Sequence, residues 1–295
     1  MRLSEAVRLC GFTIARQAVR LGYPLEESLR SLLPLVDELV VGIGDGDDGT
    51  WELVESIGDP KLSLFRSTWD PTHRRNGQVL SEETNKALAR CRGDWAIYLQ
   101  ADEVLHEDEL PALRRVIEEN DRRATETLSF RYFHFYGSYA TCQDNPNWFY
   151  PRATRAVRLG VGVQSVGDAC AFMVERDGVM RRPRRVDTGL HVYHYGWVRP
   201  PQVMREKSRR FEALQHDDEW IRRHGVDATR PGEIYGSLGH LRRFEGTHPA
   251  VMQARVARQD WSFDPRLEQQ EPDWSRRSRN YLRWVVDRSL ARLRG

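Results

Sequence analysis

An alternation of strand and helix patterns over the first 130 residues constrains the fold more than any other feature of the sequence. Short apolar runs predict strands over residues 11–15, 37–43, 61–65 and 95–99. Apolar residues at helical spacing predict helices between them, over residues 23–33, 51–57 and 79–89. Strands joined through helices favour right-handed parallel crossovers. The pattern therefore predicts an α/β fold with a Rossmann-like, mostly parallel central sheet flanked by helices.

The pattern changes after about residue 120. Runs rich in aromatic and β-branched residues predict shorter strands over 127–137, 155–159, 171–175 and 191–195. From Pro200 the spacing becomes helical, and residues 275–293 form an amphipathic basic segment. We expect one integrated domain with three regions: 1–125, a small mixed β region over 126–199, and a C-terminal helical extension over 200–295.

Composition and charge indicate a globular protein without a polyanion-binding surface. The 295 residues include 45 basic and 43 acidic side chains, a net charge of +2, so the basic footprint of a nucleic-acid-binding domain is missing. The cysteines are scattered without a Cys-x-x-Cys pair, which indicates neither a zinc site nor a disulfide framework. Neither a signal peptide nor a membrane-spanning run is recognisable, so we expect a cytoplasmic protein.

Two carboxylates follow the apolar run 95–99. Asp102 and Glu103 lie just past the end of this predicted strand, and open α/β sheets bind ligands at the carboxyl ends of their strands. Paired carboxylates there suit a divalent cation that bridges to phosphate oxygens. The same residues can instead begin the next helix, whose first turn over 106–111 is acidic, as the helix dipole favours. The local pattern leaves both interpretations open.

A series of motifs resembles the nucleotide-sugar domain of family 2 type glycosyltransferases, which have the GT-A fold. In chain order they are Asp37-Glu-Leu-Val-Val41, Gly44-Asp-Gly-Asp-Asp-Gly-Thr50, Thr84-Asn85, Gly93-Asp-Trp95 and Leu99-Gln-Ala-Asp-Glu103. The similarity covers about residues 10–115 and extends more loosely to His191-Val-Tyr-His-Tyr-Gly-Trp197.

The resemblance implies a GT-A-like transferase that moves a sugar from a nucleotide-diphosphate sugar to an acceptor hydroxyl, inverting and dependent on Mg²⁺ or Mn²⁺. Residues 1–125 would bind the donor, and residues 126–199 would bind the acceptor and supply a metal-ligand histidine. UDP is favoured as the commonest donor nucleotide of such families. The acceptor is expected to be a glycan or a lipid-linked glycan, as in the synthesis of cell-envelope polysaccharide.

The resemblance also implies a metal site. Asp102 matches the last aspartate of the Asp-x-Asp motif and would bind the cation that holds the donor diphosphate. Gln100 replaces the first aspartate; with Ala101 it would contact the donor, but it brings no charge, so Glu103 and a histidine would have to support the metal. His194 is the candidate histidine, because its odd spacing from His191 lets only one of the two face the site. A buried structural histidine is the alternative.

Further donor-binding candidates follow the first two strands and lie on the third helix. Arg16 is placed to reach the base or a phosphate, with a surface salt bridge as the alternative. Asp45 lies one position later than the aspartate pair of the family, and Asp48 fits the family pattern better but could equally cap the helix that begins at Trp51. Asn85 belongs to the matching helix motif.

Asp168 is the predicted catalytic base, because an inverting transferase needs a carboxylate to take the proton of the acceptor hydroxyl. Its alternative role is a turn beside Gly167. Aromatic residues of the same half would suit stacking on sugar rings, although most such clusters are core: Tyr132, Phe135, Tyr136, Tyr139, Trp148, Tyr150 and Trp197.

Other functions remain open at this point. A catalytically inactive nucleotide-binding or glycan-binding module of the same fold would fit the loss of charge at Gln100. A nucleotidyltransferase would normally have a glycine-rich basic loop after the first strand, and residues 15–18 contain no glycine. The basic C-terminal segment would dock on the body or on a partner subunit, or contact the inner face of an anionic membrane.

Overall fold

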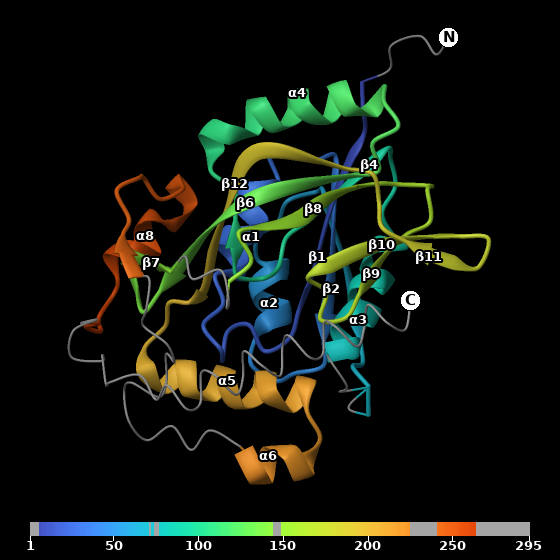
Figure 1. Cartoon of the computed structure of the whole chain (residues 1–295). Helices are drawn as coiled ribbons and strands as arrows, with labels where there is room; N and C mark the ends of the chain where they lie inside the picture. Colours follow the sequence, from blue (N-terminus) through green and yellow to red (C-terminus); the bar gives the residue numbers. More distant parts are fainter. Residues whose placement is uncertain (1–5, 71, 74–76, 144–148, 225–240, 264–295) are drawn as a thin grey trace.

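The computed structural model describes residues 6–70, 72–73, 77–143, 149–224 and 241–263. The parallel half of its main sheet consists, in spatial order, of β3 (Leu62–Ser67), β2 (Glu38–Gly44), β1 (Leu9–Ala15) and β4 (Trp95–Tyr98). Between these strands the chain forms α1 (Leu25–Leu32), α2 (Thr50–Glu55) and α3 (Gln78–Leu88) (Figure 1). The predicted α/β class is confirmed, and each predicted strand of this half is present.

The second half of the chain continues the same sheet. Its strands are β5 (Glu103–Val104), β6 (Thr127–Tyr136), β7 (Ser138–Gln143), β8 (Arg152–Arg158), β12 (Arg185–Trp197) and β13 (Leu241–Arg243). β8 runs antiparallel to β4, β6 runs antiparallel to β8, and β12 runs parallel to β6. The result is one ten-stranded sheet that the first and second halves of the chain share.

A smaller antiparallel sheet contains β9 (Val163–Val166), β10 (Ala171–Arg176) and β11 (Val179–Arg181). Asn85 of α3 holds this sheet, since its amide donates to Ser165 O at 3.0 Å and its Oδ1 accepts from Ser165 N at 2.8 Å. The second of these strands is the one predicted over 171–175, whereas its two neighbours were not foreseen.

The remaining helical segments cover the sheet. They are the 3₁₀ turn at Glu107–Glu109, α4 (Leu110–Asp121), α5 (Pro201–Gln215), α6 (Asp218–His224), the 3₁₀ turn at Ala250–Met252 and α8 (Gln253–Ala257). Figure 1 shows α5 below the carboxyl ends of the parallel strands. None of the described helices has the length and apolar character needed to cross a membrane. The helix predicted over 275–293 lies outside the described residues.

β4 is buried on both faces. Trp95 and Ile97 belong to the core on one side of the sheet, and Ala96 and Tyr98 belong to the core on the other side, as the alternation of a strand requires. A strand buried on both faces has no polar alternation, which explains its continuous apolar sequence. Because β4 is packed on both faces, it holds in place the short segment after its end, in which Asp102 lies.

Candidate active site

A cavity of about 520 Å³ opens at the carboxyl ends of β1 and β4, and α5 forms one of its walls. Its volume is within the range of small-molecule sites, and the carboxyl edge of parallel strands is where open α/β sheets bind ligands. The walls come from segments far apart in the sequence, namely 14–17, 100–102, 168–170 and the α5 residues from Met204 to Leu214.

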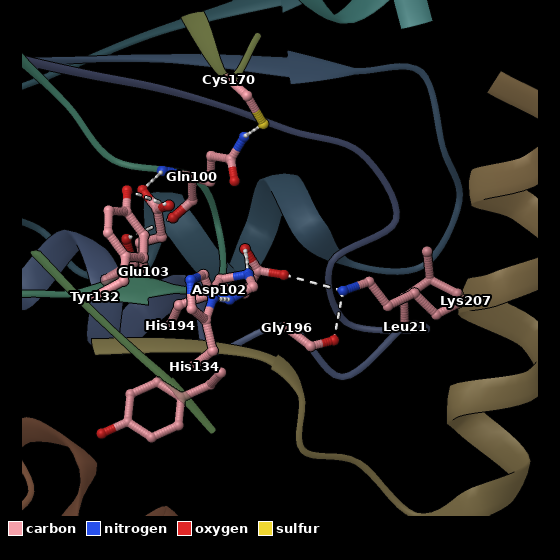
Figure 2. A network of polar contacts seen from close by, with 12 residues as sticks. Leu21, Gln100, Asp102, Glu103, Tyr132, His134, Cys170, His194, Gly196 and Lys207 are labelled. Atoms are coloured by element: carbon pink, nitrogen blue, oxygen red, sulfur yellow. Dashed lines mark hydrogen bonds and ion pairs between the residues drawn. The ribbon is translucent and has the colours of Figure 1, made fainter. Parts of the chain in front are cut away.

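Asp102 lies on the wall of this cavity, surrounded by basic groups. Its Oδ2 accepts a hydrogen bond from Lys207 Nζ at 3.0 Å (Figure 2). The same oxygen lies 3.7 Å from Arg199 Nη2. Burial alone would raise the pKa of Asp102, but these cations hold it well below its ordinary value. Asp102 is therefore ionised at any physiological pH.

His194 faces the other oxygen of Asp102, with its Nε2 3.7 Å from Oδ1. Burial lowers the pKa of His194 to about 4 and that of His134 to about 3, so both rings are neutral near pH 7. His134 Nε2 lies 2.9 Å from the carbonyl oxygen of Tyr150, which can only accept, so the hydrogen-bond network assigns the single hydrogen of this ring to Nε2.

The same network fixes the tautomer of His194. His134 Nδ1 carries no hydrogen, so it accepts from His194 Nδ1 at 2.9 Å. His194 Nε2 is then left with a lone pair toward Asp102. Gly196 allows this arrangement, because a Cβ at that position would clash with His194 Nε2. The backbone at residue 196 passes so close to the His194 ring that only glycine fits there.

Glu103 forms a buried ion pair with Arg155. Arg155 Nε donates to one oxygen at 2.7 Å and Arg155 Nη2 to the other at 2.8 Å, and both side chains are fully buried. The Tyr132 hydroxyl donates to the same carboxylate at 2.9 Å, and the Gln100 backbone N–H donates at 3.0 Å. The structure thus brings Asp102 and His194 together but engages Glu103 elsewhere, and the described residues contain no cluster of three or more metal-ligating side chains.

Arg16 and Asp45 pair at the rim of the cavity. Arg16 Nη2 donates to Asp45 Oδ2 at 2.8 Å, and the backbone N–H of Trp69 donates to Asp45 Oδ1 at 3.2 Å. Arg16 and Trp69 line the cavity, whereas Asp45, which was also predicted to bind the donor, does not. A Cβ at Gly44 would lie 2.5 Å from the Trp69 indole, so glycine at this strand end leaves room for the ring.

Asp48 makes hydrogen bonds beside the start of α2, whose N-cap residue is Gly49. Its Oδ1 accepts from the Thr50 hydroxyl at 2.8 Å and its Oδ2 accepts from Arg20 N at 2.9 Å. Asp48 and Asn85, both predicted to bind the donor, do not line the cavity, and Asn85 binds the backbone of Ser165. Gln100 and Ala101 do line the cavity, and the Gln100 side chain points toward Cys170.

Asp168 lines the cavity from the loop before β10. Its Oδ1 accepts from Cys170 N at 3.3 Å, and the neighbouring Gly167 and Ala169 both have positive φ, so the predicted turn is also present. Of the aromatic residues proposed to stack on sugars, Tyr150 and Trp197 line the cavity, and Trp148 lies outside the described residues.

The sequence interpretation missed Lys207, Arg199 and His134. Lysine is rare in this arginine-rich chain, where it occurs only at positions 61, 86 and 207, and this rarity was the one signal that could have singled out Lys207. His134 has the same strand parity as Tyr132, whose ring stacks on it, so alternation could have placed it beside the site.

The fold and this cavity define a GT-A-like α/β protein. Residues 23–178, just over half of the chain, match the model of glycosyl transferase family 2, and the chain belongs to this family. The family resemblance inferred from the motifs is therefore confirmed. No curated protein matches the sequence significantly.

Solved structures with a similar fold share little sequence identity. S. aureus TarS 1–349 in complex with UDP is 16% identical, with a TM-score of 0.40 over 67% of this chain and 63% of that chain. The glucosyl-3-phosphoglycerate synthase from Mycobacterium tuberculosis, in complex with Mn²⁺, UDP and phosphoglyceric acid, is 14% identical, with a TM-score of 0.42 over 72% of this chain and 80% of that chain.

The mannosyltransferase PcManGT from Pyrobaculum calidifontis, in complex with GDP-Man and Mn²⁺, is 15% identical, with a TM-score of 0.42 over 86% of this chain and 69% of that chain. The match to another structure of S. aureus TarS spans only 39% of that chain.

Proposed function

We propose that the protein transfers a sugar from a nucleotide-diphosphate sugar to an acceptor hydroxyl. The observation that carries the proposal is the position of Asp102, which occupies the aspartate position of the family motif and lies, ionised, on the wall of the cavity. Family membership supplies the reaction class, and a cavity at the carboxyl edge of the parallel strands supplies a place for the donor.

Asp102 and His194 would hold a divalent cation. The 3.7 Å between Asp102 Oδ1 and His194 Nε2 suits two ligands of one ion, and the lone pair on Nε2 is the state that a metal ligand requires. Bound Mg²⁺ or Mn²⁺ would neutralise charge on the departing nucleotide diphosphate, and donor oxygens would complete its coordination. Glu103 is left out of this proposal because Arg155 occupies both of its oxygens.

Asp168 would act as the base. As the acceptor oxygen attacks the anomeric carbon, its proton passes to the Asp168 carboxylate, and the electrons of the breaking sugar–oxygen bond leave with the diphosphate. This displacement inverts the anomeric centre. Tyr150 and Trp197 line the same cavity and offer ring faces to a sugar of the acceptor.

The nucleotide would lie near Arg16, Trp69 and Gln100, which line the cavity beside the end of β1. UDP is favoured only because it is the commonest donor nucleotide of such families. The acceptor class proposed is a glycan or lipid-linked glycan, which would place the protein in the cytoplasm or at the inner face of the membrane, with the basic segment 275–293 as the contact.

A thermal-shift screen tests this function. Nucleotide sugars carrying UDP, GDP, CMP and dTDP are compared with and without Mn²⁺, and the stabilising donor is then used in a transfer assay. We expect Asp102→Asn to lower kcat/KM by at least about a hundredfold, because it removes a charge that acts on the leaving group, while Asp47→Asn at the exposed surface leaves it unchanged. Stabilisation without turnover would instead favour an inactive binding module, and no stabilisation by any donor would refute the assignment.

A further inference from the structure

Lys207 joins α5 to the Asp102 end of the cavity. Its Nζ donates to Asp102 Oδ2 at 3.0 Å and to the carbonyl oxygen of Gly196 at 2.6 Å (Figure 2). The same nitrogen lies 5.0 Å from the Tyr23 ring centroid. Only 12% of the side chain is exposed, yet the residue lines the cavity rather than the core. The ammonium group is therefore placed where a ligand would enter.

The charges around Lys207 do not balance. Asp102 is the carboxylate that lies against both Lys207 and Arg199, at 3.0 Å and 3.7 Å from their nearest nitrogens. Glu103 adds nothing to this balance, because Arg155 neutralises it within a closed ion pair. Among the described residues, Lys207 and Arg199 therefore both face the carboxylate of Asp102. Excess positive charge on a largely buried surface favours an anionic ligand.

The two oxygens of Asp102 have different neighbours. Oδ1 faces the lone pair of His194 Nε2, whereas Oδ2 holds the ammonium group of Lys207. A divalent cation bound between Asp102 and His194 would repel the ammonium group of Lys207, because both positive charges would lie beside the same carboxylate. Lysine is suited to such an exchange, because its compact charge sits on a flexible four-carbon stem with rotatable donors.

We infer that Lys207 binds the diphosphate of the donor, and that Asp102 holds Lys207 until a divalent cation binds the carboxylate and releases it. The inference rests on the proposed donor site. As the bond between the anomeric carbon and the diphosphate oxygen breaks, its electron pair stays on that oxygen, and the ammonium group stabilises the charge that develops there. The acceptor proton goes to Asp168, so Lys207 transfers no proton.

Binding measurements on Lys207→Met and Lys207→Arg test this inference without turnover. Two probes are titrated by calorimetry: Mn²⁺ alone, and inorganic pyrophosphate into protein already saturated with Mn²⁺, the state in which the inference expects Lys207 to be released. Lys86→Met is the matched control, because Lys86 pairs with Glu83 on α3 and does not line the cavity. Thermal unfolding of each variant establishes that it is folded.

The inference requires opposite changes in the two affinities. In Lys207→Met, pyrophosphate affinity should fall by about tenfold or more, the loss of one charge-assisted contact, while Mn²⁺ affinity should rise several-fold because Asp102 no longer holds a competing cation. Lys207→Arg should retain pyrophosphate binding, and Lys86→Met should match the wild type in both titrations.

Two negative results can be told apart. If the wild type binds both probes and Lys207→Met binds them as Lys86→Met does, or if Mn²⁺ affinity falls with that of pyrophosphate, the inference is overturned and the donor site stands. If the wild type binds neither Mn²⁺ nor pyrophosphate, the proposed donor site fails, and the inference fails with it.

Discussion

At the scale of single residues, the geometry of the site depends on one hydrogen bond between two neutral histidines. His134 donates to the Tyr150 carbonyl, accepts from His194, and so directs the lone pair of His194 Nε2 toward Asp102. His134 does not need to touch a ligand to have this effect. Groups behind a metal ligand commonly set its tautomer and orientation. His134 is thus a positioning residue.

Replacing His134 should separate this positioning role from simple packing. His134→Phe keeps an aromatic ring but offers no acceptor, so His194 loses its fixed tautomer and we expect Mn²⁺ affinity to fall by about 10-fold to 100-fold. His134→Asn keeps an acceptor near the position of Nδ1 and should retain more of the affinity. Titration of Mn²⁺ by electron paramagnetic resonance measures both variants. Equal losses of Mn²⁺ affinity in the two variants would contradict the positioning role of His134.

At the scale of elements, Glu126 fastens the chain around β11 to the start of β6. Its carboxylate accepts from Arg181 Nη2 at 2.6 Å and from the backbone N–H of Arg184 at 2.8 Å. The hydrogen bonds from Arg181 are the main cause that lowers the pKa of Glu126 to about 2. Ionised Glu126 thus links the start of β6 to the segment between β11 and β12.

This link predicts a pH-dependent contribution to stability. Because the pKa of Glu126 is lower in the folded chain than in the unfolded one, where it is near 4.5, the contribution is present above pH 4.5 and disappears as the pH falls toward 2. We expect Glu126→Gln to lower the free energy of unfolding by about 1 to 2 kcal/mol at pH 7, a value reduced for the solvent exposure of both arginines.

Urea unfolding of the wild type and of Glu126→Gln between pH 7 and pH 2 measures the effect. The difference between the two proteins should shrink below pH 4.5. Arg182→Gln is the control, because it removes a charge from an exposed neighbouring side chain and should give no such pH dependence. A difference that stays constant down to pH 2 would contradict the role given to ionised Glu126.

The elements differ in how well the sequence reveals them. β1, β2 and β4 are covered on both faces, so their apolar runs are continuous and predict them directly. β12 begins at Arg185 with half-exposed residues, and only its buried end, near 191–195, has a strand pattern. The short strands β9 and β11 have three or four residues each, too few to establish a period.

At the scale of the whole molecule, the site is assembled across the sequence. Asp102 could be predicted because it follows a buried strand within a known motif. Lys207 could not, because 105 residues separate it from Asp102 and no local pattern encodes a contact between a strand end and a distant helix. The ion pair of Glu103 could not be predicted for the same reason: Arg155 lies 52 residues away, on a strand whose pairing partner the sequence does not state.

The pair of Glu103 and Arg155 connects the two halves of the chain, since it joins β5 to β8. Removing one partner leaves a buried charge, so we expect Glu103→Gln to lower the free energy of unfolding by about 3 to 5 kcal/mol. The double variant Glu103→Met with Arg155→Met removes both charges and should regain part of that loss. Urea unfolding measures both proteins.

Metal binding by the double variant decides the role of Glu103. If Glu103 only supports the fold, the double variant binds Mn²⁺ as the wild type does, because Asp102 and His194 are unchanged. A loss of Mn²⁺ affinity in a double variant that remains folded would show that the carboxylate leaves Arg155 to bind the cation. In that case all three residues predicted from the family motif would act together, and the ion pair would be the resting state of a movable ligand.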